Sequence, residues 1–261
     1  EADDFCDPNL LATLVPAFED RNTFLAYAKS VPVNAEGQVQ GDYEGPYLNR
    51  IANGRWSEPY DVTDNQEADL GLGIANCIPN GSAVMMRKFD PEPEFVARVT
   101  SMRMCGDWYF YLRAMRGGKV SYRNAATNYH RRHDTTVTAQ TEGSPRYFEE
   151  LQTVRDYVQD TYNLAPTTIA RIEQFVTEDV DRFGITDPKT RAEILSAATR
   201  VTPGKRLPSV LFVVSDLAPG GGQMFAVRMA NAWAAMGGRA VLGNVAYLPS
   251  HDKVVAQISP R

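Results

Sequence analysis

The chain has 261 residues, 43% of them hydrophobic, and a formal net charge of −5. At about 150 residues per domain, this length predicts one domain plus a part, or two small domains. The acidic balance with no basic block excludes nucleic acid as the main partner, and no apolar run approaches the roughly 20 residues of a transmembrane segment.

The first 140 residues predict a mixed α/β region. An acidic opening leads into an apolar stripe typical of a helix, with Leu10, Leu14 and Phe18 on one side. Residues 34–67 are rich in Gly, Asn, Asp and Pro, which indicates a long surface loop of the kind that often carries function. Aromatic residues should anchor this loop: Tyr43, Tyr47, Trp56 and Tyr60. The other expected elements are strands over 23–29, 83–86, 119–122 and 126–132, and a helix over 106–116.

The second half of the chain changes character twice. Residues 141–203 show helical spacing of apolar residues, which predicts a helical connector that ends in a linker over 202–208. An apolar, β-branched run over 209–214 is typical of a parallel strand buried on both faces. The expected helix after it has four large side chains on one face: Phe225, Met229, Trp233 and Met236. With a second strand over 239–245, residues 208–261 predict an incomplete Rossmann-like βαβ unit.

The acidic opening is the first candidate site. In an extended segment Glu1 and Asp3 project to the same side, and two carboxylates suit Mg²⁺ or Mn²⁺, which prefer oxygen ligands. Acidic residues also favour helix N-termini, so an N-terminal cluster that serves the following helix is the competing interpretation.

Asp107 is the second candidate, at the start of a helix otherwise rich in aromatic residues. The aspartate could cap the helix by accepting from its first backbone N–H groups. It could also be a general base, because an apolar surrounding raises the pKa of a carboxyl group toward neutrality. Both interpretations stay open on the sequence alone.

The segment over 128–134 is the third candidate. His130 and His133 are three residues apart on a predicted strand, so they should face opposite sides and not share one metal ion. One of them could reach a metal while Arg131 or Arg132 meets a phosphate, and a solvated basic turn is the alternative.

Two glycine-rich stretches are candidates for phosphate loops. Residues 220–222 lie between a predicted strand and helix, where a phosphate or a tight turn would fit, but they lack the Walker A lysine. Gly71-x-Gly73 is no dinucleotide fingerprint, because the third glycine is missing.

The order of these segments resembles the C-terminal half of a family 2 glycosyltransferase. The segments that carry the resemblance are the acidic E-x-D opening, N-x-I-P-N over 76–80, G-D-W-x-F-Y over 106–111, G-G-K-V-x-Y over 117–122 and N-Y-H-R-x-H over 128–133. Residues 208–246 are similar to the start of a family 4 glycosyltransferase of GT-B fold. We therefore expect residues 1–140 to be part of a GT-A, nucleotide-diphospho-sugar transferase domain, and the chain to be an internal piece of a tandem enzyme that is inactive alone.

The resemblance also implies roles for individual residues. Asp107 matches the catalytic base for the acceptor hydroxyl, while Glu1, Asp3 and His133 match a site for a divalent metal on the donor diphosphate. Asn80, Trp108 and Arg131 would contact substrate. The implied reaction is inverting transfer of a hexose from a nucleotide-diphosphate sugar to a glycan or lipid-linked acceptor, as in cell-envelope polysaccharide synthesis.

Three cysteines without a C-x-x-C pair, Cys6, Cys77 and Cys105, argue against a zinc knuckle or a disulfide framework. Free thiols fit a cytoplasmic location. A peripheral position at the inner face of the membrane is the alternative location.

Two other functions compete with the transferase. One is a carbohydrate-binding or scaffolding module without catalysis, in which Tyr43, Trp56 and Tyr60 stack on sugars. The other is a metal-dependent phosphate-ester hydrolase that uses Asp3, Asp4 and His133. A divalent metal site near Asp3 and His133 is required by both enzyme functions and not by the binding module, so its presence would distinguish them.

Overall fold

The computed structural model describes residues 3–132, 143–198, 210–214, 221–235 and 240–244. The chain forms two compact units, Glu1–Pro203 and Gly204–Arg261. Each unit is mixed α/β. Expectations for the linker over 202–208, for Glu1 and for His133 lie outside the described residues.

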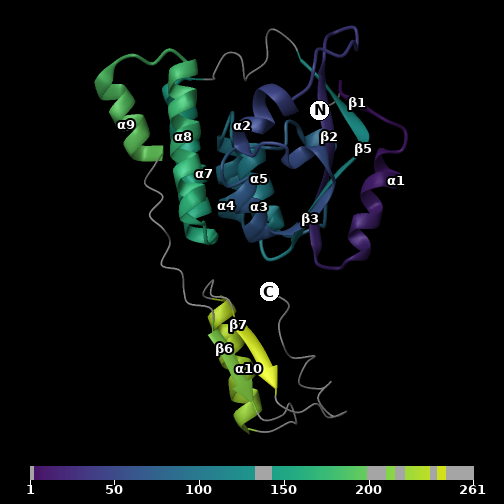
Figure 1. The fold of residues 1–261 in the computed structure, drawn as a ribbon, viewed down its shortest axis with the longest axis vertical. Helices are drawn as coiled ribbons and strands as arrows, with labels where there is room; N and C mark the ends of the chain where they lie inside the picture. Colours follow the sequence, from purple (N-terminus) through teal and green to yellow (C-terminus); the bar gives the residue numbers. More distant parts are fainter. Residues whose placement is uncertain (1–2, 133–142, 199–209, 215–220, 236–239, 245–261) are drawn as a thin grey trace. The chain divides into compact units, whose positions relative to one another are not determined.

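The first unit is built on a five-stranded mixed sheet (Figure 1). Its strands are β1 (Phe5–Cys6), β2 (Thr23–Val33), β3 (Tyr60–Thr63), β4 (Val84–Met86) and β5 (Lys119–Arg131). The order is β1-β5-β2-β4, and β3 pairs with β5. Within this sheet β2 and β5 are the parallel pair among the described strands, and their last residues, Val33 and Arg131, lie opposite each other. Both strands therefore end at the same edge of the sheet.

Strand β5 corrects one prediction. The two short strands expected over 119–122 and 126–132 are one strand of 13 residues. Its register against β2 shifts between the pairs Ala28–Arg123 and Lys29–Thr127, which is a β-bulge. The gap between the two predicted strands coincides with this bulge.

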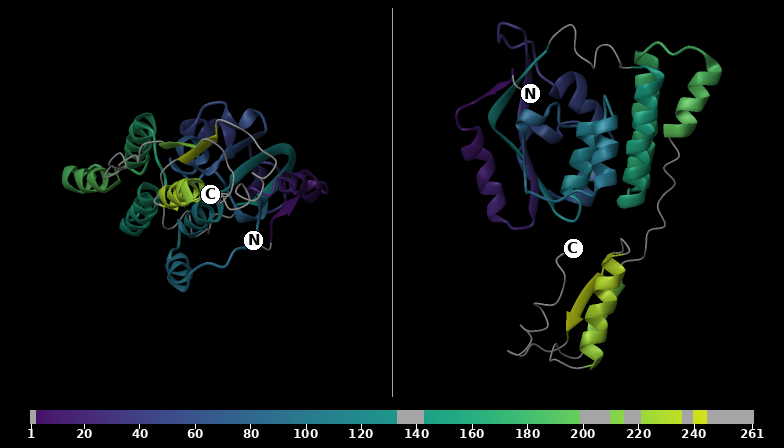
Figure 2. Two further views of the ribbon diagram at one scale, coloured as in Figure 1. Left: turned by 90° about the horizontal axis from the view of Figure 1, so that it is seen from below. Right: turned by 180° about the vertical axis from the view of Figure 1, so that it is seen from behind.

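Helices cover both faces of the sheet, with α1 on one face and α3 and α5 on the other (Figures 1 and 2). The helices of this unit are α1 (Leu10–Leu14), α2 (Asn49–Ile51), α3 (Asp64–Leu70), α4 (Pro93–Ser101), α5 (Gly106–Met115), α7 (Pro145–Thr161), α8 (Pro166–Arg182) and α9 (Pro188–Ala198). Shorter helical turns are η1 (Val15–Glu19), η2 (Glu44–Leu48), η3 (Arg55–Ser57) and η4 (Gly81–Ala83).

The main hydrophobic core lies between the sheet and helices α3, α5, α7 and α8. Leu25 of β2, Leu112 of α5, Val154 of α7 and Ile172 of α8 are all fully buried in it. The predicted helical connector thus packs on the same core as the sheet. Residues 143–198 belong to the first unit rather than forming a free link between two domains.

The segment over 34–67 is more regular than the loop that its composition predicts. It contains η2, α2, η3 and β3. The expected aromatic anchors are present, because Trp56 is only 2% exposed and the Tyr47 hydroxyl donates to the Asn76 carbonyl at 2.9 Å. Burial of these rings fixes a segment that is otherwise rich in turn-forming residues.

The second unit contains β6 (Val210–Val214), α10 (Gly221–Ala235) and β7 (Ala240–Asn244). The two strands are parallel, as predicted. Two expectations are wrong here: β6 is not buried on both faces, since Leu211 and Val213 are exposed, and α10 packs through Val227. The predicted face of α10 points outward at Phe225, because one helix covers only one face of a two-stranded sheet.

Candidate functional site

The carboxyl ends of β2 and β5 form the first part of the candidate site. Ligands of α/β proteins commonly bind at this edge of parallel strands. Here Arg131 donates through Nε to the Asp3 carbonyl at 3.0 Å and through a terminal nitrogen to the carbonyls of Asn34, at 2.9 Å, and Ala35. The Arg131 side chain therefore holds the acidic opening and the segment after β2 together.

Asp4 and Asn80 form the centre of a hydrogen-bond network beside Arg131. Asp4 accepts from the Arg131 backbone N–H at 2.8 Å and from the Asn80 amide at 2.6 Å. The side-chain oxygen of Asn80, Oδ1, accepts from the Ser30 hydroxyl at 2.9 Å and from the Asn128 side-chain amide at 3.1 Å. Asn80 is only 1% exposed, so it connects β2, β5 and the acidic opening from inside the protein.

Asp3 lies at the same edge and is exposed. Of the three predicted metal ligands it alone is within the described residues, where no group of three His, Cys, Asp or Glu side chains gathers as metal ligands would. Both oxygens of Asp4 are already engaged by Asn80 and Arg131, so the structure gives no support to the hydrolase reading of Asp4 as a ligand.

His130 connects this edge with the segment over 34–67. Its Nδ1 lies 2.8 Å from the Tyr43 hydroxyl, and the two rings stack with centroids 6.1 Å apart. Burial lowers the pKa of His130, against the opposing charge of Asp4. The His130 ring therefore holds Tyr43 beside β5 through this hydrogen bond and stacking contact.

Asp107 forms the second part of the candidate site, in the first turn of α5. One carboxylate oxygen accepts from the Trp108 backbone N–H at 2.6 Å, and the other accepts from the Asn76 amide at 3.2 Å. The residue is exposed. Burial by the protein around it raises the pKa of Asp107 to about 6, while both hydrogen bonds oppose that rise. Asp107 thus combines a helix-capping contact with an accessible, readily protonated carboxylate.

A segment of five residues joins the two parts of the site. Asn76 at one end contacts Asp107, and Asn80 at the other contacts Asp4. Because a chain extends by at most about 3.5 Å per residue, the Cα atoms of the two asparagines are within about 14 Å of each other. Asp107 and Asp4 therefore contact the two ends of one short segment, whose sequence signal is the N-x-x-x-N spacing.

Trp108 was expected to contact substrate, but its side chain is buried away from this site. Its side chain is 4% exposed, its indole N–H donates to the Leu72 carbonyl at 2.7 Å, and the Arg155 guanidinium lies 5.2 Å from the ring centroid. The ring belongs to the core because the apolar side of α5 faces the sheet. In this structure it offers no surface to a sugar.

The aromatic residues proposed for a sugar-binding module are also occupied. The Trp56 indole donates to the Tyr27 hydroxyl at 2.9 Å, and the same hydroxyl is hydrogen-bonded to Tyr60. These side chains pack the 34–67 segment onto β2. They do not form an exposed platform on which a sugar ring could stack.

The Gly71-x-Gly73 stretch has a packing role. A Cβ atom on Gly73 would lie 2.0 Å from the Ala68 carbonyl oxygen, and one on Gly71 would lie 2.3 Å from the Glu67 carboxylate. Only glycine allows the chain to turn so closely over the end of α3. In the second unit, the other glycine stretch begins helix α10, and position 220 lies outside the described residues.

The chain matches no family model and no curated protein. No helix in the described part of the chain has the length and apolar character needed to span a membrane.

Proposed function

We propose that the chain carries the acceptor side of an inverting, nucleotide-sugar-dependent glycosyltransferase of the GT-A class, with Asp107 as its base. The observation that carries the proposal is the Asp107 carboxylate. It is accessible, it is held by the Trp108 N–H and the Asn76 amide, and burial raises its pKa to about 6. A carboxylate with this pKa is suited to accept a proton near neutral pH.

The proposed reaction is a single displacement. Asp107 takes the proton of the acceptor hydroxyl while that oxygen forms a bond to the anomeric carbon of the donor sugar. The bond between the anomeric carbon and the diphosphate oxygen breaks, and its electron pair leaves with the nucleoside diphosphate. Because no covalent sugar–protein bond forms, the product has the inverted anomeric configuration.

The donor diphosphate would lie at the carboxyl ends of β2 and β5. Asp3 offers an exposed hard-oxygen ligand there, and Glu1 and His133 are the further ligands that the resemblance predicts. A divalent Mg²⁺ or Mn²⁺, when bound, would offset the negative charge of the leaving diphosphate. Arg131 supports this edge by holding the backbone of Asp3 beside the end of β2.

The fold supports the same proposal at a coarser level. A mixed sheet with helices on both faces is compatible with a Rossmann-like domain, of which GT-A is the specific form proposed. The parallel βαβ unit over 210–244 would be the start of a GT-B domain. A glycan or lipid-linked acceptor, and a place at the inner face of the membrane, are proposed with the transferase.

A transfer assay tests the proposal. The whole protein in which this sequence occurs would be incubated with nucleotide-diphosphate hexoses and glycan acceptors, with Mg²⁺ or Mn²⁺ and then with a chelator. We expect metal-dependent release of nucleoside diphosphate and an inverted linkage by NMR.

Two outcomes would contradict the proposal. Glycan binding without nucleoside diphosphate release for any donor would favour the binding module. Release of inorganic phosphate from simple phosphate esters would favour the hydrolase.

A further inference from the structure

Helix α7 places two buried charged residues against the segments that carry Asp107 and Asn76. Glu150 is 7% exposed and Arg155 is 1% exposed. Each of them makes hydrogen bonds to backbone groups outside its own helix. The two residues lie five positions apart and hold two different segments of the chain.

Glu150 binds the segment that leads into α5. Its carboxylate accepts from the backbone N–H groups of Arg103 at 2.8 Å, Met104 at 2.7 Å and Cys105 at 3.0 Å. Although burial opposes the effect, these three N–H groups hold the pKa of Glu150 below its usual value. Within the described residues the side chain of Cys105, at the start of α5, makes no capping bond. Glu150 therefore fixes from α7 the three residues that lead into α5, including Cys105 immediately before the helix.

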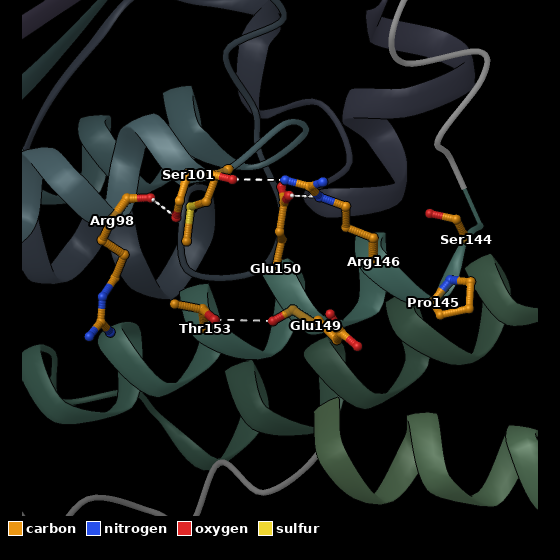
Figure 3. A pocket seen from close by; sticks show the side chains of 9 residues that line it. Arg98, Ser101, Ser144, Pro145, Arg146, Glu149, Glu150 and Thr153 are labelled. Carbon is orange, nitrogen blue, oxygen red and sulfur yellow. Dashed lines mark hydrogen bonds and ion pairs between the residues drawn. The ribbon is translucent and has the colours of Figure 1, made fainter.

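The surroundings of Glu150 are visible beside an open hollow between α4 and α7 (Figure 3). Arg146 donates to Glu150 at 3.2 Å and to the Ser101 carbonyl at 2.9 Å. Thr153, farther along α7, donates to the carbonyl of Glu149 in its own helix at 3.1 Å. The carboxylate of Glu150 thus faces the segment before α5, and the Thr153 hydroxyl does not.

Arg155 binds the segment that leads into Asn76. Its guanidinium donates to the carbonyl oxygens of Gly73 and Ile74, both by short hydrogen bonds. Its burial lowers its pKa to about 10. Two residues farther along the chain is Asn76, the partner of Asp107. Glu150 therefore binds the backbone N–H groups of the segment that leads to Asp107. Arg155 binds the backbone carbonyls of the segment that leads to Asn76.

From this geometry we infer that Glu150 and Arg155 are positioning residues, through which α7 sets the placement of Asp107 relative to Asn76 for sugar transfer. The inference rests on the proposed function of Asp107. At 3.2 Å, the hydrogen bond between Asn76 and Asp107 is at the long end of the ordinary range, so contacts from outside the pair help to fix its geometry. The charge-assisted contacts from α7 are shorter and more numerous, and they define the pair more strongly.

Glu150→Gln and Arg155→Lys test the inference, with Thr153→Ala as the control on the same helix. A carboxamide presents one N–H₂ group where the carboxylate accepted, and an ammonium reaches one carbonyl in place of two. In the first variant we expect hydrogen exchange at the amides of Arg103, Met104 and Cys105 to accelerate at least tenfold, with exchange in β2 unchanged. The control should leave both unchanged.

Kinetics of the whole protein supply the second measurement. Both variants should lower kcat at least tenfold with little change in KM for the donor, because the donor edge is held by other residues. In an Asp107→Asn background, Glu150→Gln should cause no further loss, since a positioning residue acts through the group that it positions. A merely structural role would lower the rate by the same factor in both backgrounds.

The outcomes separate this inference from the proposed function. Full activity of Asp107→Asn would overturn the proposed base. An inactive Asp107→Asn variant together with full kcat in folded Glu150→Gln and Arg155→Lys would overturn the positioning role alone. Unchanged exchange at Arg103, Met104 and Cys105 in Glu150→Gln would overturn the inference whatever the activity.

Discussion

Helices α3 and α5 begin in the same way, and the comparison shows which of their aspartates is available for chemistry. Asp64 opens α3 and Asp107 lies in the first turn of α5. In each, one carboxylate oxygen accepts from the next backbone N–H, that of Asn65 at 2.8 Å and that of Trp108 at 2.6 Å. Burial raises the pKa of both groups.

The second oxygen of each carboxylate makes the difference. In Asp64 it accepts from the backbone N–H of Gly117 at 2.7 Å, which fixes the turn between α5 and β5. In Asp107 it accepts from the Asn76 side-chain amide at 3.2 Å, and the residue is exposed. The position at a helix start does not decide the role of the acid. The role depends on the hydrogen-bond partner of the second carboxylate oxygen.

The largest effect should come from substituting both acids by asparagine. Asp107→Asn should lower sugar transfer by about 10²- to 10⁴-fold, the usual contribution of a general base, while Asp64→Asn should keep most of the activity. Steady-state transfer rates with matched circular dichroism spectra would measure this. Equal losses in the two variants would remove the distinction between the two aspartates.

Asn76→Ala should have a smaller effect on the same site. Removing the amide takes a hydrogen bond from the ionised form of Asp107, so the pKa of that carboxyl should rise further above about 6. We expect transfer to fall by about tenfold, which corresponds to about 1.4 kcal/mol. The acidic limb of the rate profile should move to higher pH. A shift to lower pH would show that Asn76 does not stabilise the carboxylate.

Asp64→Ala should act on stability and not on chemistry. The Gly117 N–H, in a turn whose φ is +79°, would lose its acceptor and bind water instead. We expect the free energy of unfolding to fall by about 1 kcal/mol, as measured by denaturant titration. In Asp107→Ala, a fall of the same size would mean that the two carboxylates stabilise the fold alike.

The smallest effect should be the pH dependence of stability that Asp107 causes. Its folded pKa of about 6 is above the unfolded value of about 3.9, so the folded state binds the proton more tightly. That contribution to stability is complete below about pH 4 and is lost as the pH rises through about 6. Asp107→Asn should therefore become more stable relative to the wild type between pH 4 and 6. A constant difference across this range would exclude the raised pKa.

The sequence predicted the local parts of this fold better than its long-range contacts. Helical spacing and Gly-rich stops placed the helix over 106–116 and the strand over 83–86 within a residue or so. The bulge in β5 was read as a break, because a strand that changes register looks like two strands in sequence. The 34–67 segment was read as a loop, because the burial of Trp56 depends on a partner, Tyr27, that is distant in the chain.

The candidate site was predictable in part for the same reason. The sequence predicts either a capping contact or an accessible carboxylate for Asp107, and the structure contains both features. Asn80 and Trp108 were expected to meet substrate but are buried, because polar and aromatic residues satisfy hydrogen bonds inside the protein as readily as at a ligand. Nothing in the local sequence marks Glu150 or Arg155, since their partners lie 45 and 81 or more residues away.

The most direct test of the account is the pH–rate profile of sugar transfer, compared between the wild type and Asp107→Asn. The wild type should lose kcat/KM with a unit slope below a midpoint near pH 6, where the base becomes protonated. The residual activity of the variant should show no such limb. A limb near pH 6 that survives unchanged in Asp107→Asn would assign the titrating base to another residue and contradict the account.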